Sequence, residues 1–332
     1  MEIRQPYLLF LGEAHDELAA KSANGIVQWR PEACVGQLRL DGCKVDLGVP
    51  DMTVAQAAEA GARTLVLGVA VAGGAIPDAW AEPFTEALEH GLDIANVLHR
   101  RLADLPGLAD KAAETGRRLI EVRLPQESFK VGTGADRTGK RLLTVGTDCS
   151  CGKMYASLAI EKEMRARGRK ATFKATGQSG ILIVGSGVPV DAVVADFIAG
   201  AIESLTPDAD ADHWDIIEGQ GSLFHPSFAG VSLGLLHGAQ PDALVLCHEP
   251  TRTHMRALEH QPLPDIATCI ETNLELARLT NPGVEMVGIA VNTSALERAE
   301  AEDLLASYGE TYGLPAVDPV ATGVGPIVDR IA

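Results

Sequence analysis

The sequence predicts an α/β protein built from two consecutive domains, each with a mainly parallel sheet. Three observations support this prediction. Nearly continuous apolar runs, of which 64–71 is the clearest, alternate with segments of helical periodicity, as is typical of parallel strands buried on both faces. A glycine-rich polar stretch at 131–140 separates two such series, so we expect domains at residues 1–132 and 133–332. A chain of 332 residues is long enough to form two cores.

The N-terminal domain is predicted to open with a strand at 7–11 that ends at Gly12. Residues 21–25 have the composition of a turn, and Gly61 is placed to end a helix. The other elements expected here are a helix at 53–60, a strand at 64–71, a helix at 77–90, a strand at 92–98, a helix at 109–116 and a strand at 119–122. This order predicts a small Rossmann-like domain. No G-x-G-x-x-G sequence opens a helix after the first strand, so dinucleotide binding is not supported there.

The C-terminal domain is predicted to be larger. Its first strand, the apolar run at 142–145, leads through a polar loop into a helix at 153–167, which Gly168 ends. Further strands are expected at 170–176, 214–218, 243–248 and 284–292, and further helices at 191–204, 271–280 and 297–313. Ligands of such folds bind at the carboxyl edge of the sheet, which is where the polar loop is expected to lie.

The loop 146–152 has the features of a phosphate-binding loop. It follows a buried strand, contains two glycines, precedes Lys153 and opens a helix, whose N-terminus attracts anions. Five residues separate the glycines, one more than in the usual P-loop, and Met154 stands where a nucleotide-hydrolysing P-loop has Ser or Thr to hold Mg²⁺. We therefore expect a P-loop NTPase-like three-layer domain that binds phosphate but holds Mg²⁺ poorly, because a thioether is a soft ligand.

The composition limits the partners. A net charge of −17 argues against nucleic acid, which needs a basic surface, although a local nest of N–H groups can still bind a small anion. No run approaches the roughly 20 apolar residues of a membrane span, and the first residues lack a signal-peptide core. The six cysteines are scattered and show no zinc-binding spacing. We expect reduced thiols, a cytoplasmic protein, no nucleic-acid or membrane partner and no metal site.

Polar residues follow several of the predicted strands. Glu218 ends the strand at 214–218 and could hold a metal, act as a base or simply accept hydrogen bonds from a neighbouring loop. His225 follows closely and could share that site or be structural. Asn292, at the end of the last major strand, could hydrogen-bond a base or cap the next helix.

Two other strand ends supply cationic side chains. Arg252 follows the buried strand that ends at His248. Its guanidinium could bind a carboxylate through two hydrogen bonds, or it could form a solvent-exposed ion pair with Glu249. Lys174 ends the strand at 170–176 beside a glycine-flanked turn, which could be a binding loop or a simple solvated loop.

Several segments together resemble a bacterial family long labelled only as a domain of unknown function. These segments are 67–80, 87–99, 145–154, 217–226 and 288–296. The family joins a Rossmann-like N-terminal domain to a P-loop domain and carries methionine after the P-loop lysine. It includes D-glutamate N-acetyltransferases of D-amino-acid catabolism, which work with a racemase of the enolase type. The loop by itself is also similar to the variant loop of dethiobiotin synthetase and its relatives.

The resemblance implies transfer of an acetyl group from acetyl-CoA to the amine of D-glutamate or a similar acidic D-amino acid. A phosphate loop without a metal ligand suits a cofactor whose phosphates are held and not cleaved. The residues expected to hold the CoA phosphates are Gly146, Thr147, Ser150, Gly152, Lys153 and Met154. The candidate bases for the substrate ammonium are Asp148, Glu218 and His248, and the residues expected to bind the substrate carboxylates are Lys174 and Arg252.

Two other functions stay open at this point. An ATP- and Mg²⁺-dependent ligase or kinase of the dethiobiotin synthetase type would use the same loop, although Met154 speaks against it. A non-catalytic nucleotide or CoA sensor would bind without turnover, with the N-terminal domain docking a partner. We also expect a homo-oligomer, because apolar strands are expected at the domain edges.

Overall fold

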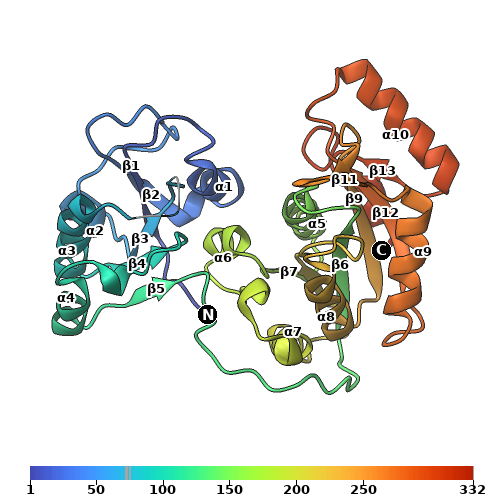
Figure 1. Cartoon of the computed structure of the whole chain (residues 1–332), viewed down its shortest axis with the longest axis horizontal. Helices are drawn as coiled ribbons and strands as arrows, with labels where there is room; N and C mark the ends of the chain where they lie inside the picture. Colours follow the sequence, from blue (N-terminus) through green and yellow to red (C-terminus); the bar gives the residue numbers. More distant parts are fainter. Residues whose placement is uncertain (72–73, 75, 332) are drawn as a thin grey trace. The chain divides into compact units, whose positions relative to one another are not determined.

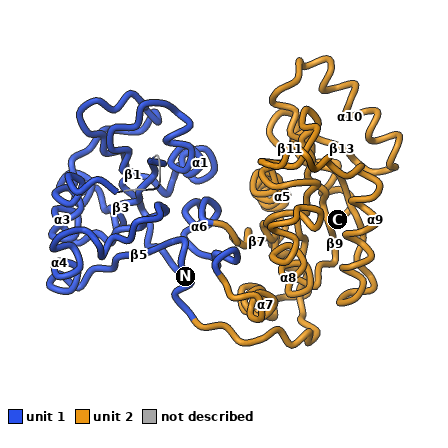
Figure 2. Tube along the Cα trace, viewed as in Figure 1, with its two compact units in different colours: residues 1–127, 178–192 blue, residues 128–177, 193–332 orange. Residues whose placement is uncertain are grey.

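The computed structural model of the chain describes residues 1–71, 74 and 76–331. Residues 72, 73 and 75, which belong to the segment 67–80 named above, lie outside the described residues. The chain forms two compact units (Figure 2). One unit contains Met1–Glu127 and Gln178–Ala192, and the other contains Ser128–Gly177 and Val193–Ala332.

Within the described residues, the first unit contains a five-stranded parallel sheet in the order β2-β1-β3-β4-β5 (Figure 1). Its strands are β1 (Tyr7–Gly12), β2 (Cys34–Arg39), β3 (Thr64–Leu67), β4 (Asp93–Asn96) and β5 (Leu119–Glu121). Its helices before residue 128 are α1 (Lys21–Trp29), α2 (Val54–Glu59), α3 (Ala81–Glu89) and α4 (Leu108–Thr115), with short 3₁₀ helices η1 (Pro31–Ala33), η3 (Asp78–Trp80) and η4 (Leu102–Asp104). Phe10 of β1 packs against Trp80 and Phe84, with ring centroids 4.8 and 5.1 Å apart, so aromatic contacts hold α3 against the sheet.

The segment predicted as a turn, 21–25, is instead the first half of helix α1. Ala23 and Ile26 of this helix are fully buried. Gly25 lies against Ile183, where even an added Cβ atom would keep an ordinary distance of 3.6 Å. An Asn-Gly pair favours a turn only locally, and burial of an apolar helix face overrides that preference. The turn prediction is therefore wrong.

Residues 178–192 belong to the first unit although they follow β7 (Ala171–Lys174) of the second sheet. Helix α6 (Gln178–Val184) buries an apolar face made of Gly180, Ile181, Leu182 and Ile183. The Ile3 N–H donates to the Gly185 carbonyl at 2.6 Å, and Gly185 has a φ of +79°, a conformation that favours glycine. The domain boundary expected between residues 132 and 133 assigns residues 178–192 to the second domain, whereas in the structure they belong to the first unit.

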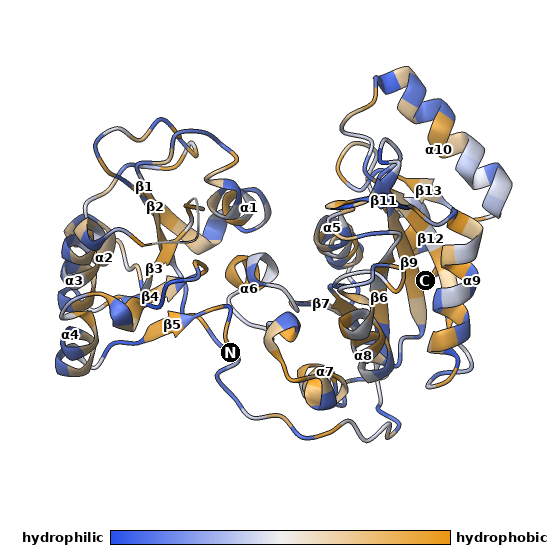
Figure 3. Cartoon of the chain, viewed as in Figure 1, coloured by the Kyte–Doolittle hydropathy of each residue, from blue (hydrophilic) through white to orange (hydrophobic). Residues whose placement is uncertain are grey.

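The described part of the second unit contains a six-stranded parallel sheet in the order β13-β12-β9-β6-β8-β7. Its remaining strands are β6 (Lys140–Gly146), β8 (Trp214–Ile217), β9 (Ala243–His248), β12 (Glu285–Val291) and β13 (Ala316–Val317), and an antiparallel hairpin adds β10 (His254–Met255) and β11 (Leu258–Pro262). Its helices are α5 (Lys153–Ala166), α7 (Ile198–Leu205), α8 (Ala229–Ala239), α9 (Ile266–Ala277), α10 (Arg298–Tyr312) and α11 (Gly325–Arg330). Strands β6, β9 and β12 are buried over almost their whole length, and Figure 3 shows their hydrophobic character. The carboxyl ends of these three strands therefore define the centre of one sheet edge.

The predicted α/β class is confirmed, with its Rossmann-like and P-loop-like sheets. The helix expected at 191–204 is shorter, because two 3₁₀ turns, η5 (Val190–Ala192) and η6 (Ala195–Phe197), precede α7. Helix α9 begins earlier than expected, since Asp265 caps it by accepting a hydrogen bond of 2.8 Å from the Thr268 N–H. No described helix combines the length and the apolar character needed to cross a membrane.

Candidate functional site at the phosphate loop

The loop between β6 and α5 lies at the carboxyl edge of the second sheet. Two of its residues have a left-handed backbone, Ser150 with φ +53° and Gly152 with φ +104°. Gly146 has no room for a side chain, because a Cβ atom there would lie 2.6 Å from Cys151 Sγ and 2.9 Å from Lys153 Nζ. This tight loop brings main-chain N–H groups to the N-terminus of α5, an arrangement that stabilises an anion.

Lys153 is the first residue of α5, and its side chain is buried. Its Nζ atom donates to the main-chain oxygen of Asp148 at 2.8 Å and lies 3.6 Å from Cys151 Sγ. The lysine predicted to bind phosphate thus lies against the loop, where an incoming anion would compete with a neutral carbonyl for its protons.

Met154 is half-buried in the first turn of α5. The hydroxyls of Thr144 in β6 and Ser157 in α5 lie 3.0 Å apart and form a hydrogen bond with each other. The Thr144 hydroxyl also accepts the Gly219 N–H at 3.0 Å. These two hydroxyls therefore connect β6 with α5 and with the segment after β8. At position 154 the side chain has a thioether and no hydroxyl that could bind Mg²⁺.

Glu218 follows β8 directly, and only 4% of it is exposed. Its Oε2 atom accepts hydrogen bonds of 3.0 Å from the N–H groups of Thr176 and Gly177. Burial raises the pKa of this carboxyl from 4.5 to about 7, against the lowering effect of those N–H groups and of Lys153. A carboxyl of this pKa can exchange a proton near neutral pH.

Asp148 lies inside the loop and is 1% exposed. Its Oδ2 atom accepts from Arg252 Nη1 at 2.5 Å and from the Arg256 N–H at 2.7 Å. Its Oδ1 atom is buried and has no hydrogen-bond partner among the described residues. Arg252 also donates to the Cys149 carbonyl at 2.7 Å and pairs with Glu249 Oε2 at 3.2 Å, so its guanidinium ties the loop to the segment after β9.

His248 is the last residue of β9 and is largely buried. Its Nδ1 atom lies 3.1 Å from the Thr147 hydroxyl, so β9 contacts the phosphate loop directly. Burial lowers the pKa of His248, and the neighbouring Arg252 lowers it further against the effect of Glu249. The imidazole is therefore neutral at neutral pH and available as a proton acceptor.

A pocket of about 800 Å³ adjoins the loop and is contained in the second unit. Its walls include Cys151, Tyr155, Asn292, Arg298, Asp318 and Thr322. The wall beyond β12 is fixed by Asp318 Oδ2, which accepts from the Thr293 N–H at 2.9 Å and from the Thr293 hydroxyl at 2.6 Å. This volume is within the range of small-molecule sites, and the pocket opens beside the cradle for an anion.

Comparison with known proteins identifies the family. The "Domain of unknown function (DUF1611_C) P-loop domain" matches residues 129–328, and the "Domain of unknown function (DUF1611_N) Rossmann-like domain" matches residues 38–125. The chain belongs to the DUF1611 family. A crystal structure of a DUF1611 family protein from Anabaena variabilis ATCC 29413 is similar, with a TM-score of 0.82 and 32% identity over 99% of each chain.

Two relatives of this DUF1611 chain carry the name D-glutamate N-acetyltransferase. The protein from Tritonibacter scottomollicae is 55% identical over 330 residues, which are 99% of each chain. The protein from Pseudoalteromonas sp. is 51% identical over 331 residues, which are 100% of each chain. The predicted family, with its Rossmann-like and P-loop domains, is confirmed.

Among the predicted site residues of this DUF1611 protein, Asp148 lies in the loop, His248 bonds to the neighbouring Thr147, and Glu218 interacts with Lys153. The Lys174 carbonyl accepts a hydrogen bond of 3.0 Å from the Glu218 N–H, but the Lys174 side chain pairs with another residue, because its Nζ atom lies 3.4 Å from Asp215 Oδ1 in β8. Its assignment to a substrate carboxylate stays a prediction.

Sequence reasoning missed Arg256 of the DUF1611 site. This residue lies between β10 and β11, its N–H bonds to Asp148, and its guanidinium contacts the Ser150 hydroxyl. The hairpin has no strong strand pattern. The concentration of arginine and histidine over 252–260 is the signal that could have indicated it.

Proposed function

We propose that this protein is a D-glutamate N-acetyltransferase that takes its acetyl group from acetyl-CoA. The observation that carries the proposal is its identity of 55% and 51%, over essentially the whole chain, with two proteins of that name. The chemistry of the loop supports it independently, because a phosphate cradle without a metal-binding hydroxyl suits a ligand whose phosphates stay intact.

The loop and the adjoining pocket suggest how acetyl-CoA binds. Its diphosphate would occupy the cradle formed by Gly146, Thr147, Ser150, Gly152, Lys153 and Met154. The pocket beside Tyr155 and Asn292 is large enough for an adenosine and combines apolar walls with an amide that can pair with a base edge. Arg256, next to Ser150, adds a guanidinium suited to a further phosphate.

The reaction requires a base that removes a proton from the substrate ammonium, and the resulting amine then has to attack the thioester. The amine of D-glutamate arrives as an ammonium, loses a proton to a base, and attacks the carbonyl carbon of the thioester. The new C–N bond forms as the C–S bond breaks, the nitrogen loses a second proton to become the amide, and the departing CoA thiolate takes up that proton. Glu218 is our candidate for the base, because its pKa of about 7 leaves it partly ionised at neutral pH.

His248 and Asp148 differ from Glu218 as candidate bases. Neutral His248 can accept a proton, but its Nδ1 atom is already bonded to the Thr147 hydroxyl, which leaves Nε2 for the substrate. The Oδ2 atom of Asp148 is occupied by Arg252 and by the Arg256 N–H. We therefore assign Asp148 to holding the loop and the two arginines in place.

Arg252 is the better placed of the two cations predicted to bind the substrate. It lies at the loop, although a substrate carboxylate has to share it with Asp148 and Glu249. Lys174 would have to leave Asp215 to take part. The proposal also includes a cytoplasmic role in D-amino-acid catabolism, a homo-oligomeric state, and no nucleic-acid or membrane partner.

The test combines turnover and binding. Release of the CoA thiol and formation of N-acetylglutamate by chromatography are measured with D-glutamate, L-glutamate and D-aspartate. Calorimetry is run in parallel with acetyl-CoA and with ATP and Mg²⁺. We expect product from D-glutamate and binding of acetyl-CoA. Tight ATP binding with Mg²⁺-dependent ADP release would overturn the proposal in favour of a ligase or kinase, and binding of CoA without turnover of any acidic amino acid would indicate a sensor.

A further inference from the structure

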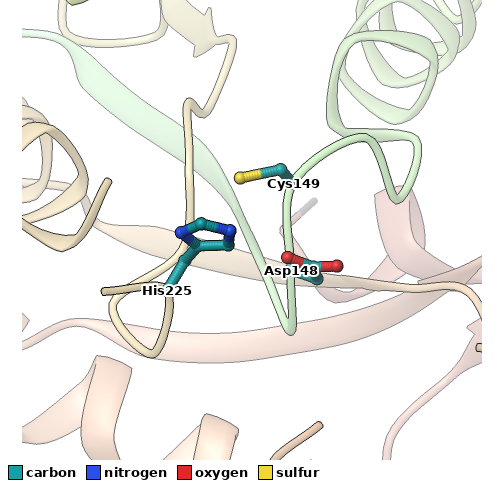
Figure 4. A group of neighbouring side chains, drawn as sticks. All are labelled: Asp148, Cys149 and His225. Carbon is teal, nitrogen blue, oxygen red and sulfur yellow. The ribbon is translucent and has the colours of Figure 1, made fainter. Parts of the chain in front are cut away.

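Three side chains of different chemistry converge beside the phosphate loop. Asp148 and Cys149 come from the loop itself, and His225 comes from the connection between β8 and α8. A carboxylate oxygen, the thiol sulfur and a ring nitrogen all lie within 4.8 Å of one another. Figure 4 shows the three side chains turned toward a common space.

The Asp148 carboxylate presents one buried oxygen atom that is available to a cation. Its Oδ2 atom has two donors, from Arg252 and Arg256, whereas its Oδ1 atom is buried with no hydrogen-bond partner in the described part of the chain. Asp148 is 1% exposed, so water cannot compensate freely. A buried carboxylate oxygen without a partner is unfavourable, and a bound metal ion is one of the few groups that would remove the penalty.

His225 is held as a metal-binding histidine needs to be. It is 3% exposed and packs on Phe228 with ring centroids 4.6 Å apart. Among the described residues, its two ring nitrogens make long hydrogen bonds with the main chain, Nδ1 with the Ser227 N–H at 3.2 Å and Nε2 with the Arg256 carbonyl at 3.3 Å. A metal ion would replace one contact while the other keeps the ring oriented, as outer partners do at metal sites.

We propose that Asp148, Cys149 and His225 form a binding site for one divalent transition-metal ion of the Zn²⁺ class. Oxygen, nitrogen and sulfur donors together favour Zn²⁺ over Mg²⁺ or Ca²⁺, which prefer oxygen alone. Zinc bonds of about 2.0–2.3 Å place tetrahedral ligands ~3.5 Å apart, so the side chains have to close by about 1 Å. Cys149 is only half-buried, and a rotation of its side chain supplies that movement.

Three protein ligands leave a fourth position for water or for an oxygen of a bound molecule, which is the pattern of open zinc sites. This position differs from that of the Mg²⁺ ion in a nucleotide-hydrolysing P-loop, which the residue after the lysine holds and which Met154 cannot hold. Sequence spacing could not predict the site, because its third ligand lies far along the chain.

The experiment measures metal binding directly and does not depend on acetyl transfer. The full chain is stripped with a chelator and dialysed against Zn²⁺, and bound metal is counted by mass spectrometry. Co²⁺ is then bound in place of Zn²⁺, since a thiolate ligand gives a charge-transfer absorption in the near ultraviolet. We expect one equivalent per chain and the thiolate absorption.

Cys149→Ser and His225→Gln are each expected to weaken Zn²⁺ binding more than about 100-fold, because even loss of an outer partner costs 10–100-fold. Cys43→Ser, a half-buried thiol of the first unit, is the matched control and should bind as the parent does. Thermal unfolding of each metal-free variant checks that it folds. Less than one equivalent of bound Zn²⁺, no thiolate absorption, or unchanged binding by folded Cys149→Ser overturns the proposal.

Discussion

The ammonium group of Lys153 lies 2.8 Å from the main-chain oxygen of Asp148, with both groups buried. The lysine is thus held by the same loop with which it is proposed to bind phosphate. A phosphate oxygen would replace a neutral acceptor by a negatively charged one, which adds a Coulomb attraction to the hydrogen bond of the ammonium group. Because the side chain is already ordered, little conformational entropy is lost when the ligand binds.

Lys153→Met tests this role. Loss of a charge-assisted hydrogen bond of about 1.5–3 kcal/mol should weaken acetyl-CoA binding by roughly 10- to 100-fold in calorimetry. Lys170→Met is the control, since that exposed lysine pairs with the surface carboxylates Asp210 and Asp212. Equal affinities for the parent and Lys153→Met would show that the loop does not hold the CoA phosphates through this residue.

Glu218→Gln tests the proposed base. In the parent protein, kcat/KM for D-glutamate should rise with pH through an inflection near 7, where the carboxyl loses its proton. The amide cannot accept that proton, so we expect a loss of about 10²- to 10⁴-fold and no inflection in this range. If Glu218→Gln keeps both the rate and the inflection, Glu218 is not the base, and His248 is the next residue to replace.

The same carboxyl predicts a pH dependence of stability. Burial raises its pKa from 4.5 to about 7, so between these values the folded state keeps a proton that the unfolded state releases. Stability therefore falls as pH rises through this window and is level above it. Relative to Glu218→Gln, the parent should lose on the order of 3 kcal/mol of unfolding free energy between pH 4.5 and 7.5 in urea titrations. A difference that stays constant with pH would mean that the buried carboxyl titrates normally.

Gly219→Ala should destabilise the second unit strongly. A Cβ atom at this position would lie 1.7 Å from the Thr144 carbonyl oxygen, and main chain cannot move aside easily. We expect a loss of roughly 3 kcal/mol or more in unfolding free energy. Gly230→Ala is the matched control, because no atom lies within 4 Å of an added Cβ there and the position is helical, so stability should be unchanged or slightly higher. Equal effects of the two substitutions would contradict the close approach of β6 and the segment after β8.

Met154→Thr should introduce the metal ligand that the loop lacks. The hydroxyl would stand at the first turn of α5, where nucleotide-hydrolysing P-loops hold Mg²⁺. We expect ATP binding that strengthens when Mg²⁺ is added, at least about tenfold relative to the parent in paired calorimetric titrations. If ATP binding depends on Mg²⁺ equally in the parent and in Met154→Thr, the residue at position 154 does not determine whether the loop binds Mg²⁺.

Much of the fold could be predicted because its strands are buried on both faces. The runs that became β6, β9 and β12 are continuous and apolar, and their polar ends mark one edge of the sheet. The turn predicted at 21–25 failed because burial of Ala23 and Ile26 in helix α1 outweighs the local preference of Asn-Gly.

The candidate site was only partly predictable. The loop with Lys153 has a local pattern, and so its position was predicted. The hydrogen bonds of Asp148 with Arg252 and Arg256, and its proximity to His225, join segments that lie far apart in the sequence, so no local sequence pattern could predict them. In the sequence, Lys174 and Arg252 look equivalent, because each follows or ends a strand. The Lys174 side chain pairs with Asp215, however, and the sequence does not show toward which residue a side chain points.

Residues 178–192 have a consequence for how this gene can be divided. The polypeptide passes from one unit to the other at three places, after residues 127, 177 and 192. A fragment ending at 127 lacks helix α6, and a fragment starting at 128 carries that helix with Ile181, Leu182 and Ile183 left without their native covering. Neither fragment contains a whole unit, so recombination at the first boundary, after residue 127, yields two incomplete pieces.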